Sequence, residues 1–403
     1  DEDITEPDVA EPDVAEPDAV EPDVTEPDAT TDVEPDVVEP DVVEPDTTLD
    51  VVEPDTTPDV EPDVEPDIAT DVTPDVEPDV EPDVPEEFCA DTVWRQELPN
   101  PPFFDCSRAP TAAISQTVVP NARGYHGLAI GVDGNLYGND RTSLLRFNRA
   151  GDGGLFVPGA GTVEQMAFLE PGGDLVAGDN GGGLERYTPA GARRTLAPDL
   201  GIYGVEVGPD GFVYAAGSDG VWRINADTGD SETLLEAEDD FLPHTVTFNA
   251  DYTLMLIGTV SGFFGAGGSD IIAYEVDCDL TPIGEPLVYG IEVGGGYHDA
   301  LAFDICGNLY VNDFVDSALF RVVPGEPIEG EIYTLGGEVT RYLDWGLREA
   351  PEQSYGHGFV WGTGDNGWRP DAAYMPLPYA GDLVKEVLIG IPGVRWNGRG
   401  LIE

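Results

Sequence analysis

Hydrophobic and polar positions alternate in a short phrase that recurs along the chain after residue 120. The phrase reads HGLAIGVDGNLY from His126, YGVEVGPDGFVY from Tyr203 and DALAFDICGNLY from Asp299. Alternation with a period of two marks half-buried strands, and Asp-Gly or Gly-Asn between two such runs marks a tight reversal. Each phrase therefore predicts two antiparallel strands joined by a short turn.

Weaker copies of the phrase begin at Glu164 and His244, and we expect a sixth, degenerate copy, RYLDWGLRE, at Arg341. A third strand usually follows each phrase, as LLRFN from Leu144 illustrates. The copies start 38 to 55 residues apart, which is about the length of one four-stranded propeller blade. A single blade cannot bury both of its faces, so six blades must stack radially to form a core. The predicted fold class is all-β, a six-bladed β-propeller.

The first 85 residues follow a different pattern, in which EPDV, EPDA and TPDV units repeat every four to seven residues. Proline recurs too often for a helix or a sheet, and the segment has no aromatic residue that could pack. Residues 1–85 are therefore predicted to be a disordered, extended acidic stalk or linker. A plain spacer is the simpler interpretation, and weak condensation of calcium on the many carboxylates is the alternative.

Charge narrows the range of partners. The chain has 81 acidic and 17 basic residues, a formal net charge of −64. Residues 1–87 hold 36 of the acidic residues and none of the basic ones, so the remainder carries 45 acidic and 17 basic residues, or −28. This balance argues against nucleic acid or an anionic membrane as a partner. No run of 18 apolar residues could span a bilayer, and we expect a monomer that binds a small molecule, a glycan or a protein.

Four cysteines suggest two disulfides. Residues 86–110 are predicted to be a connecting segment, in which Cys89 and Cys106 would close a 17-residue loop. A metal site is the alternative, but no Cys-x-x-Cys or neighbouring histidine completes one. Cys278 and Cys306 are expected on the same face of adjacent blades, so they form the second predicted pair. Two disulfides indicate an oxidising compartment.

We therefore expect an extracytoplasmic protein, secreted or displayed at the cell surface. Its export signal, with or without a lipid-carrying cysteine, would have been removed upstream of Asp1. The propeller is predicted to occupy residues 111–403, with candidate closing strands at 111–120 and from Lys385. One terminus of a propeller adds a strand to the blade built by the other, which removes the free sheet edge. The sequence leaves open which terminus supplies the outermost strand.

The fourth blade is the longest, because glycine-rich insertions occur at residues 258–270 and 290–297. Inserted loops on a rigid scaffold commonly carry function. A tolerated surface insertion is equally compatible with the sequence.

Candidate chemistry lies at the residue that opens each innermost strand. Innermost strands line the central channel, so these six residues are predicted to form a ring at one of its openings. All six are polar or ionisable: His126, Glu164, Tyr203, His244, Asp299 and Arg341. The ring is either simply solvated, as channel openings are, or it holds a ligand or a metal.

Imidazoles together with a carboxylate suit zinc, or iron in a two-histidine, one-carboxylate arrangement. Calcium is the other candidate cofactor, although it prefers more oxygen ligands. Glu206 and Asp304, further along the strands, are expected to orient the ligands. His357 is expected in the second strand of blade six, with a packing role. The predicted metal ligands are His126, His244 and Asp299.

The phrases HGLAIGVDGNLY and DALAFDICGNLY resemble strand motifs of the senescence-marker/gluconolactonase-like (regucalcin-like) six-bladed propellers, over roughly residues 120–395. The resemblance implies a divalent cation in the channel, held by Glu, Asn and Asp residues at such strand starts, and hydrolysis of lactones. Asp299 matches the aspartate of that family. His244 stands where the family usually has asparagine, and His126 stands where glutamate or asparagine is expected. The acidic stalk is similar to those of bacterial surface lipoproteins.

Two functional hypotheses follow. The first is a surface-displayed propeller that binds a ligand at its channel opening, since the sequence has no Gly-x-Ser-x-Gly, His-Glu-x-x-His or P-loop motif. The second is a metal-dependent lactonase or related hydrolase, in which the metal polarises a carbonyl and activates water. Its catalytic residues would be Glu164 as general base and Tyr203 or Arg341 as the stabiliser of oxyanion charge. The sequence leaves open whether the protein is an enzyme.

Overall fold

The computed structural model of the chain describes residues 89–92, 94–95, 104–131, 133–169, 173–179, 181–263, 265, 268–345 and 356–394. The stalk predicted at residues 1–85 lies outside the described residues, so the prediction made for it stays a prediction. None of the described residues belongs to a helix long and apolar enough to cross a lipid bilayer.

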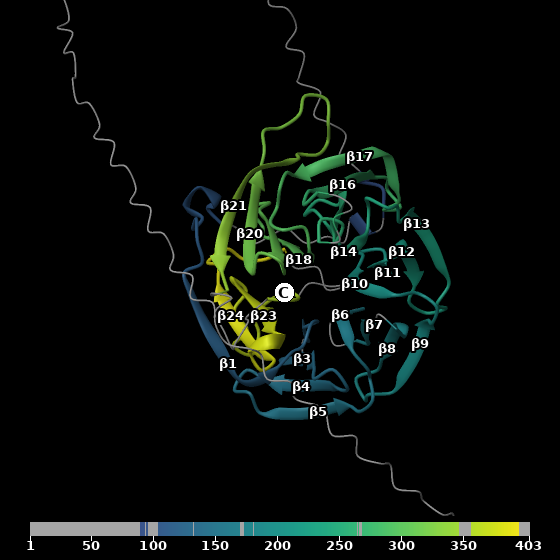
Figure 1. Ribbon diagram of the computed structural model, residues 1–403, viewed down its shortest axis with the longest axis vertical. Coiled ribbons are helices and arrows are strands. Elements are labelled where there is room, and N and C mark those ends of the chain that lie inside the picture. The colour runs from purple at the N-terminus through teal and green to yellow at the C-terminus, as the bar shows by residue number, and fades with distance from the viewer. Residues whose placement is uncertain are drawn as a thin grey trace, which may run out of the picture. The chain divides into compact units, whose positions relative to one another are not determined.

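The described strands form six four-stranded antiparallel sheets, arranged as the blades of a propeller around a central channel (Figure 1). The innermost strands of blades one to six are β2 (Ala129–Ile130), β6 (Val163–Phe168), β10 (Ile202–Val207), β14 (Pro243–Phe248), β18 (His298–Phe303) and β22 (Val360–Trp361). The second strands are β3 (Asn135–Asn139), β7 (Leu175–Asp179), β11 (Phe212–Gly217), β15 (Leu254–Thr259), β19 (Leu309–Asp313) and β23 (Ala372–Leu377). This arrangement confirms the predicted fold class.

The outer half of each blade completes the sheet. The third strands are β4 (Leu144–Asn148), β8 (Gly183–Tyr187), β12 (Gly220–Asn225), β16 (Ile271–Val276), β20 (Ala318–Pro324) and β24 (Leu383–Leu388). The outermost strands are β5 (Gly153–Val157), β9 (Arg193–Ala197), β13 (Ser231–Glu236), β17 (Pro282–Gly290), β21 (Gly336–Asp344) and β1 (Ser115–Arg123). Two short 3-10 segments accompany them, η1 (Cys106–Arg108) and η2 (Pro378–Ala380).

The two predicted closing strands pair with each other. β1 lies antiparallel to β24, with Ser115 opposite Leu388 and Val118 opposite Lys385. The N-terminal side of the propeller thus supplies the outermost strand of the blade that the C-terminal side builds. Closure of this kind gives every blade four strands. It also answers which terminus supplies the outermost strand: the N-terminal one.

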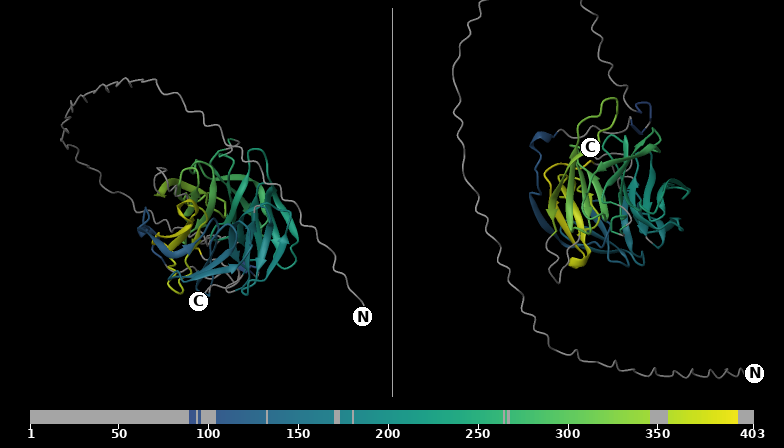
Figure 2. Two further views of the ribbon diagram at one scale, coloured as in Figure 1. Left: turned by 60° about the horizontal axis from the view of Figure 1, so that its bottom comes forward. Right: turned by 45° about the horizontal axis from the view of Figure 1, so that its top comes forward.

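The predicted start of blade six was wrong. Arg341 lies in β21, the outermost strand of blade five, where it pairs with Phe320 of β20. Blade six begins instead with β22 at Val360. The reason is the long connection between β20 and β21, which extends outward from blade five (Figures 1 and 2). Together with the long connection from β21 to β22, it lengthens the fifth repeat, so a regular spacing places the sixth copy one strand too early.

The core lies between neighbouring blades, where aromatic and branched side chains of facing sheets interlock. Tyr137 of blade one meets Phe156 of its own blade and Phe168 of blade two edge-on, each with ring centroids 5.2 Å apart. Tyr187 and Trp368 are among the large side chains that are fully buried. Burying each side chain of this size stabilises the fold by about 1.5–3 kcal/mol. The packed blades therefore hold the channel strands in fixed positions.

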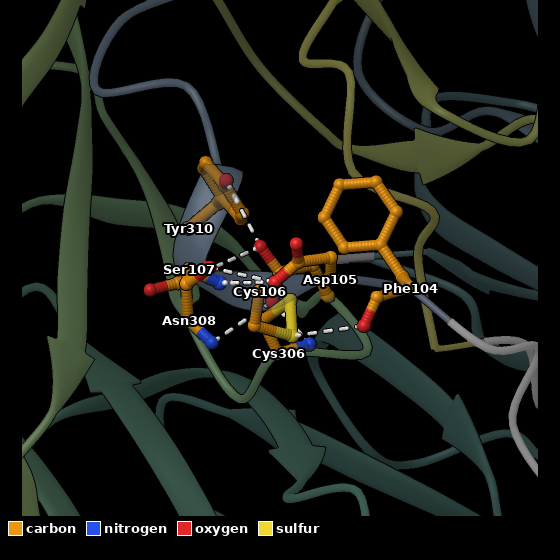
Figure 3. Close-up of a disulfide and its surroundings, with 8 residues drawn as sticks. Phe104, Asp105, Cys106, Ser107, Cys306, Asn308 and Tyr310 are labelled. Atoms are coloured by element: carbon orange, nitrogen blue, oxygen red, sulfur yellow. Dashed lines mark hydrogen bonds between the residues drawn. A yellow bond between two sulfur atoms is a disulfide. The ribbon is translucent and has the colours of Figure 1, made fainter.

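Both predicted disulfide pairings were wrong, although all four cysteines form disulfides. Cys89 is bonded to Cys278 and Cys106 to Cys306, with Cα atoms 5.4 and 5.6 Å apart. Cys278 follows the third strand of blade four, and Cys306 follows the first strand of blade five. Since first and third strands run in the same direction, both cysteines lie at the same end of the blades. The segment before β1 contacts that end, so each of its cysteines bonds to a different blade; Figure 3 shows the disulfide between Cys106 and Cys306.

Further contacts fix the segment before β1. The indole of Trp94 donates a hydrogen bond of 3.1 Å to the carbonyl of Cys278 and packs edge-on against Tyr252. Arg321 of β20 donates to the carbonyl of Pro110 at 2.6 Å. We call this end of the blades the turn end and the opposite end, where the innermost strands begin, the opening.

Candidate functional site

Six side chains form the ring at the opening. His126 lies three residues before β2 and His357 three residues before β22. The other four occupy the second position of β6, β10, β14 and β18. The ring members are therefore His126, Glu164, Tyr203, His244, Asp299 and His357.

Local irregularities in the sheets orient four of these side chains. The register between the first and second strands shifts between Val163 and Met166 in blade two, and an equivalent shift occurs in blades three, four and five. The ring residues at these shifts are Glu164, Tyr203, His244 and Asp299. A bulge frees a residue from the strand ladder and redirects its side chain, which explains why bulges are common beside functional sites.

Arg341 is not part of the ring. Its guanidinium pairs with the carboxylate of Asp344 at 2.5 Å and stands over the ring of Phe320, and its side chain is 45% exposed. The role predicted for it, stabilising oxyanion charge beside the other ring residues, is therefore excluded by its position. His357 takes the sixth place, three residues before the first strand of blade six and not in the second strand as predicted.

Two carboxylate–imidazole contacts organise the ring. His126 Nδ1 contacts Glu164 Oε2 across the boundary between blades one and two. His357 Nδ1 lies 3.0 Å from Asp299 Oδ2. The imidazoles of His126 and His357 are stacked, with centroids 4.2 Å apart and planes 10° apart. His244 Nδ1 lies 3.0 Å from the carbonyl oxygen of His298 and 3.9 Å from Asp299 Oδ1.

Several buried polar atoms of the ring lack a hydrogen-bond partner among the described residues. They are His126 Nε2, His357 Nε2 and Asp299 Oδ2, the last of which contacts His357 only at poor hydrogen-bond geometry. A carboxylate beside Nδ1 favours the tautomer that carries its proton there, and the Nε2 atom then presents a lone pair. Unpaired buried polar groups cost stability, so these atoms mark the ring as a candidate site.

Burial sets the charge of the ring. It raises the pKa of Asp299 to about 7, against the opposing effect of the neighbouring His244. It lowers the pKa of His126 and of His244, and it lowers that of His357 to about 3. The imidazoles are therefore neutral near pH 7, and the formal charge of the ring comes from Glu164 and the ionised fraction of Asp299.

Aromatic side chains surround the imidazoles, and of these only Tyr203 was predicted from the sequence. Tyr125 stacks on His126 with centroids 4.0 Å apart, and Tyr203 stacks on His244 at 4.8 Å. Tyr297 meets His244 edge-on at 5.0 Å, and Phe314 lies 5.1 Å from His357. A sequence signal for two of them exists, since Tyr125 directly precedes His126, which opens its phrase, and Tyr297 precedes His298, the neighbour of the phrase-opening Asp299.

The glycine-rich insertions of blade four contribute to this aromatic wall. Tyr297 ends the insertion at 290–297, and its ring contacts Phe263, which belongs to the insertion at 258–270. Phe263 is 50% exposed. The insertions therefore bring apolar surface to the opening.

The side chain of Gln165 crosses the channel beneath the ring. Gln165 of blade two donates to the carbonyl of Asp299 in the opposite blade five, and it accepts from the Val205 amide at 3.3 Å. A cavity of about 150 Å³ lies next to it and is lined by the residues that follow ring members, Gly127 and Gly358 among them. Gln165 therefore forms a floor between the ring and this cavity.

The two residues predicted to orient ligands lie elsewhere. Glu206 lines the cavity, where burial raises its pKa to about 8. Asp304 lies at the turn end and accepts hydrogen bonds from Asn308 and Tyr310. His298 is also structural, because its Nδ1 accepts from the Thr259 amide and its Nε2 donates to the Val293 carbonyl.

The predicted metal ligands do not form a metal site in this arrangement. Among the described residues, no group of three or more His, Cys, Asp or Glu side chains could hold a metal ion. An imidazole binds a metal in the plane of its ring, so the stacked, nearly parallel His126 and His357 cannot share one. His244 has its Nδ1 against the His298 carbonyl, which leaves only Nε2. The ring as arranged therefore fits neither zinc nor calcium.

Solved structures similar to this one include three six-bladed propellers. A luciferin-regenerating enzyme has a TM-score of 0.53 and 12% sequence identity, over 72% of this chain and 99% of that one. The calcium-binding protein regucalcin from Agrobacterium tumefaciens has a TM-score of 0.52 and 14% identity, over 71% of this chain and 97% of that one. A gluconolactonase from Xanthomonas campestris has a TM-score of 0.50 and 11% identity, over 70% and 92%.

A scan of the sequence against known protein families finds no match, and neither does a search of curated proteins. At 11–14% identity the likeness concerns the fold, and the activities in those names are those of the proteins compared. The chain thus shares the six-bladed propeller fold of regucalcin and gluconolactonase, as the resemblance of its strand phrases predicted.

Proposed function

We propose that this protein is an exported, surface-displayed propeller that binds a ligand at the ring of its channel opening. The observation that carries the proposal is the set of buried, unpartnered polar atoms there, on His126, His357 and Asp299. Buried polar groups without a hydrogen-bond partner are uncommon in folded proteins, and a bound ligand or water is one explanation for them. The aromatic wall adds the apolar contact area that small-molecule sites typically provide around a few polar groups.

Export is supported by the two disulfides, which are typical of proteins that fold in an oxidising environment. Display at the cell surface extends this step, on the basis of the acidic stalk predicted at residues 1–85. Antibodies raised against the propeller should label intact source cells. Absence of labelling on cells that contain the protein would contradict surface display.

The binding proposal can be tested with a chemically diverse set of small molecules, observed by ligand-detected NMR with the full chain. We expect some compounds to bind the unmodified protein and to lose binding in His126→Ala and His357→Ala. Arg341→Ala provides the control, because that side chain lies outside the ring, and it should bind like the unmodified protein. If no compound distinguishes the ring variants from the control, the opening is not the binding site.

Hydrolysis of the lactonase type is the second candidate. It is favoured by the His126–Glu164 contact, because a carboxylate that holds Nδ1 protonated leaves Nε2 free to accept a proton as general base. Asp299, whose pKa is raised to about 7, could donate a proton near neutral pH. Tyr203, beside His244, would contribute a hydroxyl to the same site.

The catalytic candidate predicts turnover of simple lactones or esters that disappears in Glu164→Gln while the fold is retained. Elemental analysis of the same preparations measures whether a metal is bound, which tests the metal-dependent form of the hypothesis. Turnover that survives Glu164→Gln would show that the contact between Glu164 and His126 is not needed to prepare His126 as general base. If no substrate in the panel is turned over but compounds still bind at the ring, ligand binding remains as the only proposed function.

A further inference from the structure

Resting on the proposed ligand-binding role, we infer that the ring selects a small organic cation, a primary ammonium group attached to an apolar body. Three features of the opening lead to this ligand class: its charge, the type of its unpaired atoms and its aromatic surroundings.

The formal charges that face the ring are negative. Glu164 and Asp299 are the carboxylates of the ring, and their side chains are 12% and 5% exposed. Their imidazole neighbours are neutral, for the reason given above. Arg141 is a cation near the rim, but its guanidinium stands 4.3 Å above the Tyr125 ring and donates towards Pro378 and Asp382. A cation would therefore enter a region with uncompensated carboxylates, whereas an anion would be repelled.

The unpaired atoms are hydrogen-bond acceptors. Because Glu164 holds the proton of His126 on Nδ1, His126 presents Nε2 as a lone pair, and Asp299 Oδ2 is an acceptor when ionised. A primary ammonium group has three donors and no acceptor, so it matches such a set without leaving an atom of its own unpaired. A hydroxyl group supplies one donor only, and a carboxylate supplies none.

The aromatic side chains complete the match. A cation near the faces of aromatic rings is attracted by their quadrupoles, and Arg141 over Tyr125 already makes such a contact at this rim. Tyr203, Tyr297 and Phe314 lie against the ring imidazoles, where they can contact the apolar body of the ligand. Gln165 closes the channel beneath, which limits the ligand to a small molecule held at the opening.

Benzylammonium is a suitable probe, and benzyl alcohol is its neutral analogue of nearly the same shape. Both should be titrated into the full chain at physiological salt, with binding followed by calorimetry and by ligand-detected NMR. We expect benzylammonium to bind one site at least tenfold more tightly than benzyl alcohol. Benzyltrimethylammonium keeps the charge but has no N–H donor, and it should bind more weakly than benzylammonium.

Because the chain is acidic throughout, unspecific attraction of cations must be separated from the site. Glu164→Gln and Asp299→Asn should each weaken benzylammonium binding at least tenfold. Glu232→Gln is the matched control, since it removes the same charge from an exposed side chain of β13 that pairs with Arg223; it should change the affinity less than twofold. Thermal unfolding of each variant confirms that the comparison concerns folded protein.

Equal binding of the ammonium and the alcohol would overturn the inference, as would equal losses in Glu164→Gln and Glu232→Gln. The proposed function fails separately. If ring-dependent compounds exist but are neutral or anionic, the opening binds ligands and the charge preference is wrong. If no compound depends on the ring, the ligand-binding proposal falls together with the inference.

Discussion

Buried polar side chains are hydrogen-bonded differently at the two ends of the channel strands. At the turn end, Asp304 accepts hydrogen bonds from the amide of Cys306, the amide and side chain of Asn308, and the hydroxyl of Tyr310. The same device recurs in blade three, where Asp210 accepts from Tyr214, and in blade one. At the opening, His126, His357 and Asp299 keep buried atoms without such partners.

This difference separates architecture from a candidate site. The hydrogen bonds to a paired buried carboxylate offset part of the cost of leaving water and specify one turn geometry, although burial still raises the pKa of Asp304. An unpaired one keeps that cost, and the surrounding fold has to carry it. We therefore expect the polar residues of the turn end to stabilise the fold. We expect the unpaired polar residues of the opening to destabilise it, as is common at binding sites.

The largest expected effect concerns the disulfide that joins the segment before β1 to blade five. Replacing both Cys106 and Cys306 by Ala should lower the free energy of unfolding by about 4 kcal/mol, since the bond spans 200 residues and restricts the unfolded chain. Chemical denaturation with the other disulfide intact measures this. Ligand binding at the opening should persist in the folded double variant, and an unchanged unfolding midpoint would refute the stabilising role.

Next in size is the loss of the carboxylate in a turn. Asp304→Ala should cost about 3 kcal/mol, because it leaves the buried amide of Asn308 and hydroxyl of Tyr310 without their acceptor. Asp133→Ala removes the equivalent carboxylate from an exposed position in blade one and should cost about 1 kcal/mol. Equal losses of unfolding free energy in the two variants would show that burial does not determine how much the turn carboxylate stabilises the fold.

Removing the ring carboxylate of Asp299 should raise the free energy of unfolding, whereas removing Asp304 should lower it. Burial raises the pKa of Asp299 from 3.8 to about 7, so the unfolded chain ionises this group at lower pH than the folded chain does. Its contribution to the free energy of unfolding is therefore fully present below pH 4 and is lost as the pH rises to about 7. Asp299→Asn removes this dependence, and the variant should gain about 4 kcal/mol relative to the unmodified protein between pH 4 and pH 8. Denaturation curves at several pH values test it, and parallel curves for the two proteins would contradict the shifted titration.

The smallest effect is expected at Arg341. Its ion pairs with Asp344 and Asp316 involve side chains that are at least 38% exposed, and pairs of this kind contribute about 0–1 kcal/mol. Arg341→Ala should change the free energy of unfolding by less than about 1 kcal/mol and should leave binding at the opening intact. A loss of binding would return this residue to the site.

The repeat pattern was sufficient for the architecture but not for every position in it. Five innermost strands begin where the phrases begin, because alternation and tight turns depend on neighbours in the sequence. The sixth did not follow, since the lengthened β20–β21 connection broke the spacing on which the prediction depended. His357 was consequently assigned to the wrong strand, although its position brings it 3.0 Å from Asp299.

The disulfides show the same limit. Sequence proximity favoured Cys89 with Cys106 and Cys278 with Cys306, whereas the fold brings each early cysteine to a separate blade. Pairing depends on where a segment lies in space, and the pattern around a cysteine contains no information about that.

The sequence by itself determined an all-β propeller of six blades, closure through the two ends of the domain, and five polar residues at one opening of the channel. These features follow from periodicity and composition, which local physics translates directly into strands and turns. Only the tertiary structure decided that His357 completes the ring, that Gln165 crosses beneath it, and that the imidazoles stack instead of converging on a metal. Each of these features depends on contacts between different blades. Those contacts are set by how all six blades pack around the channel, which no single repeat encodes.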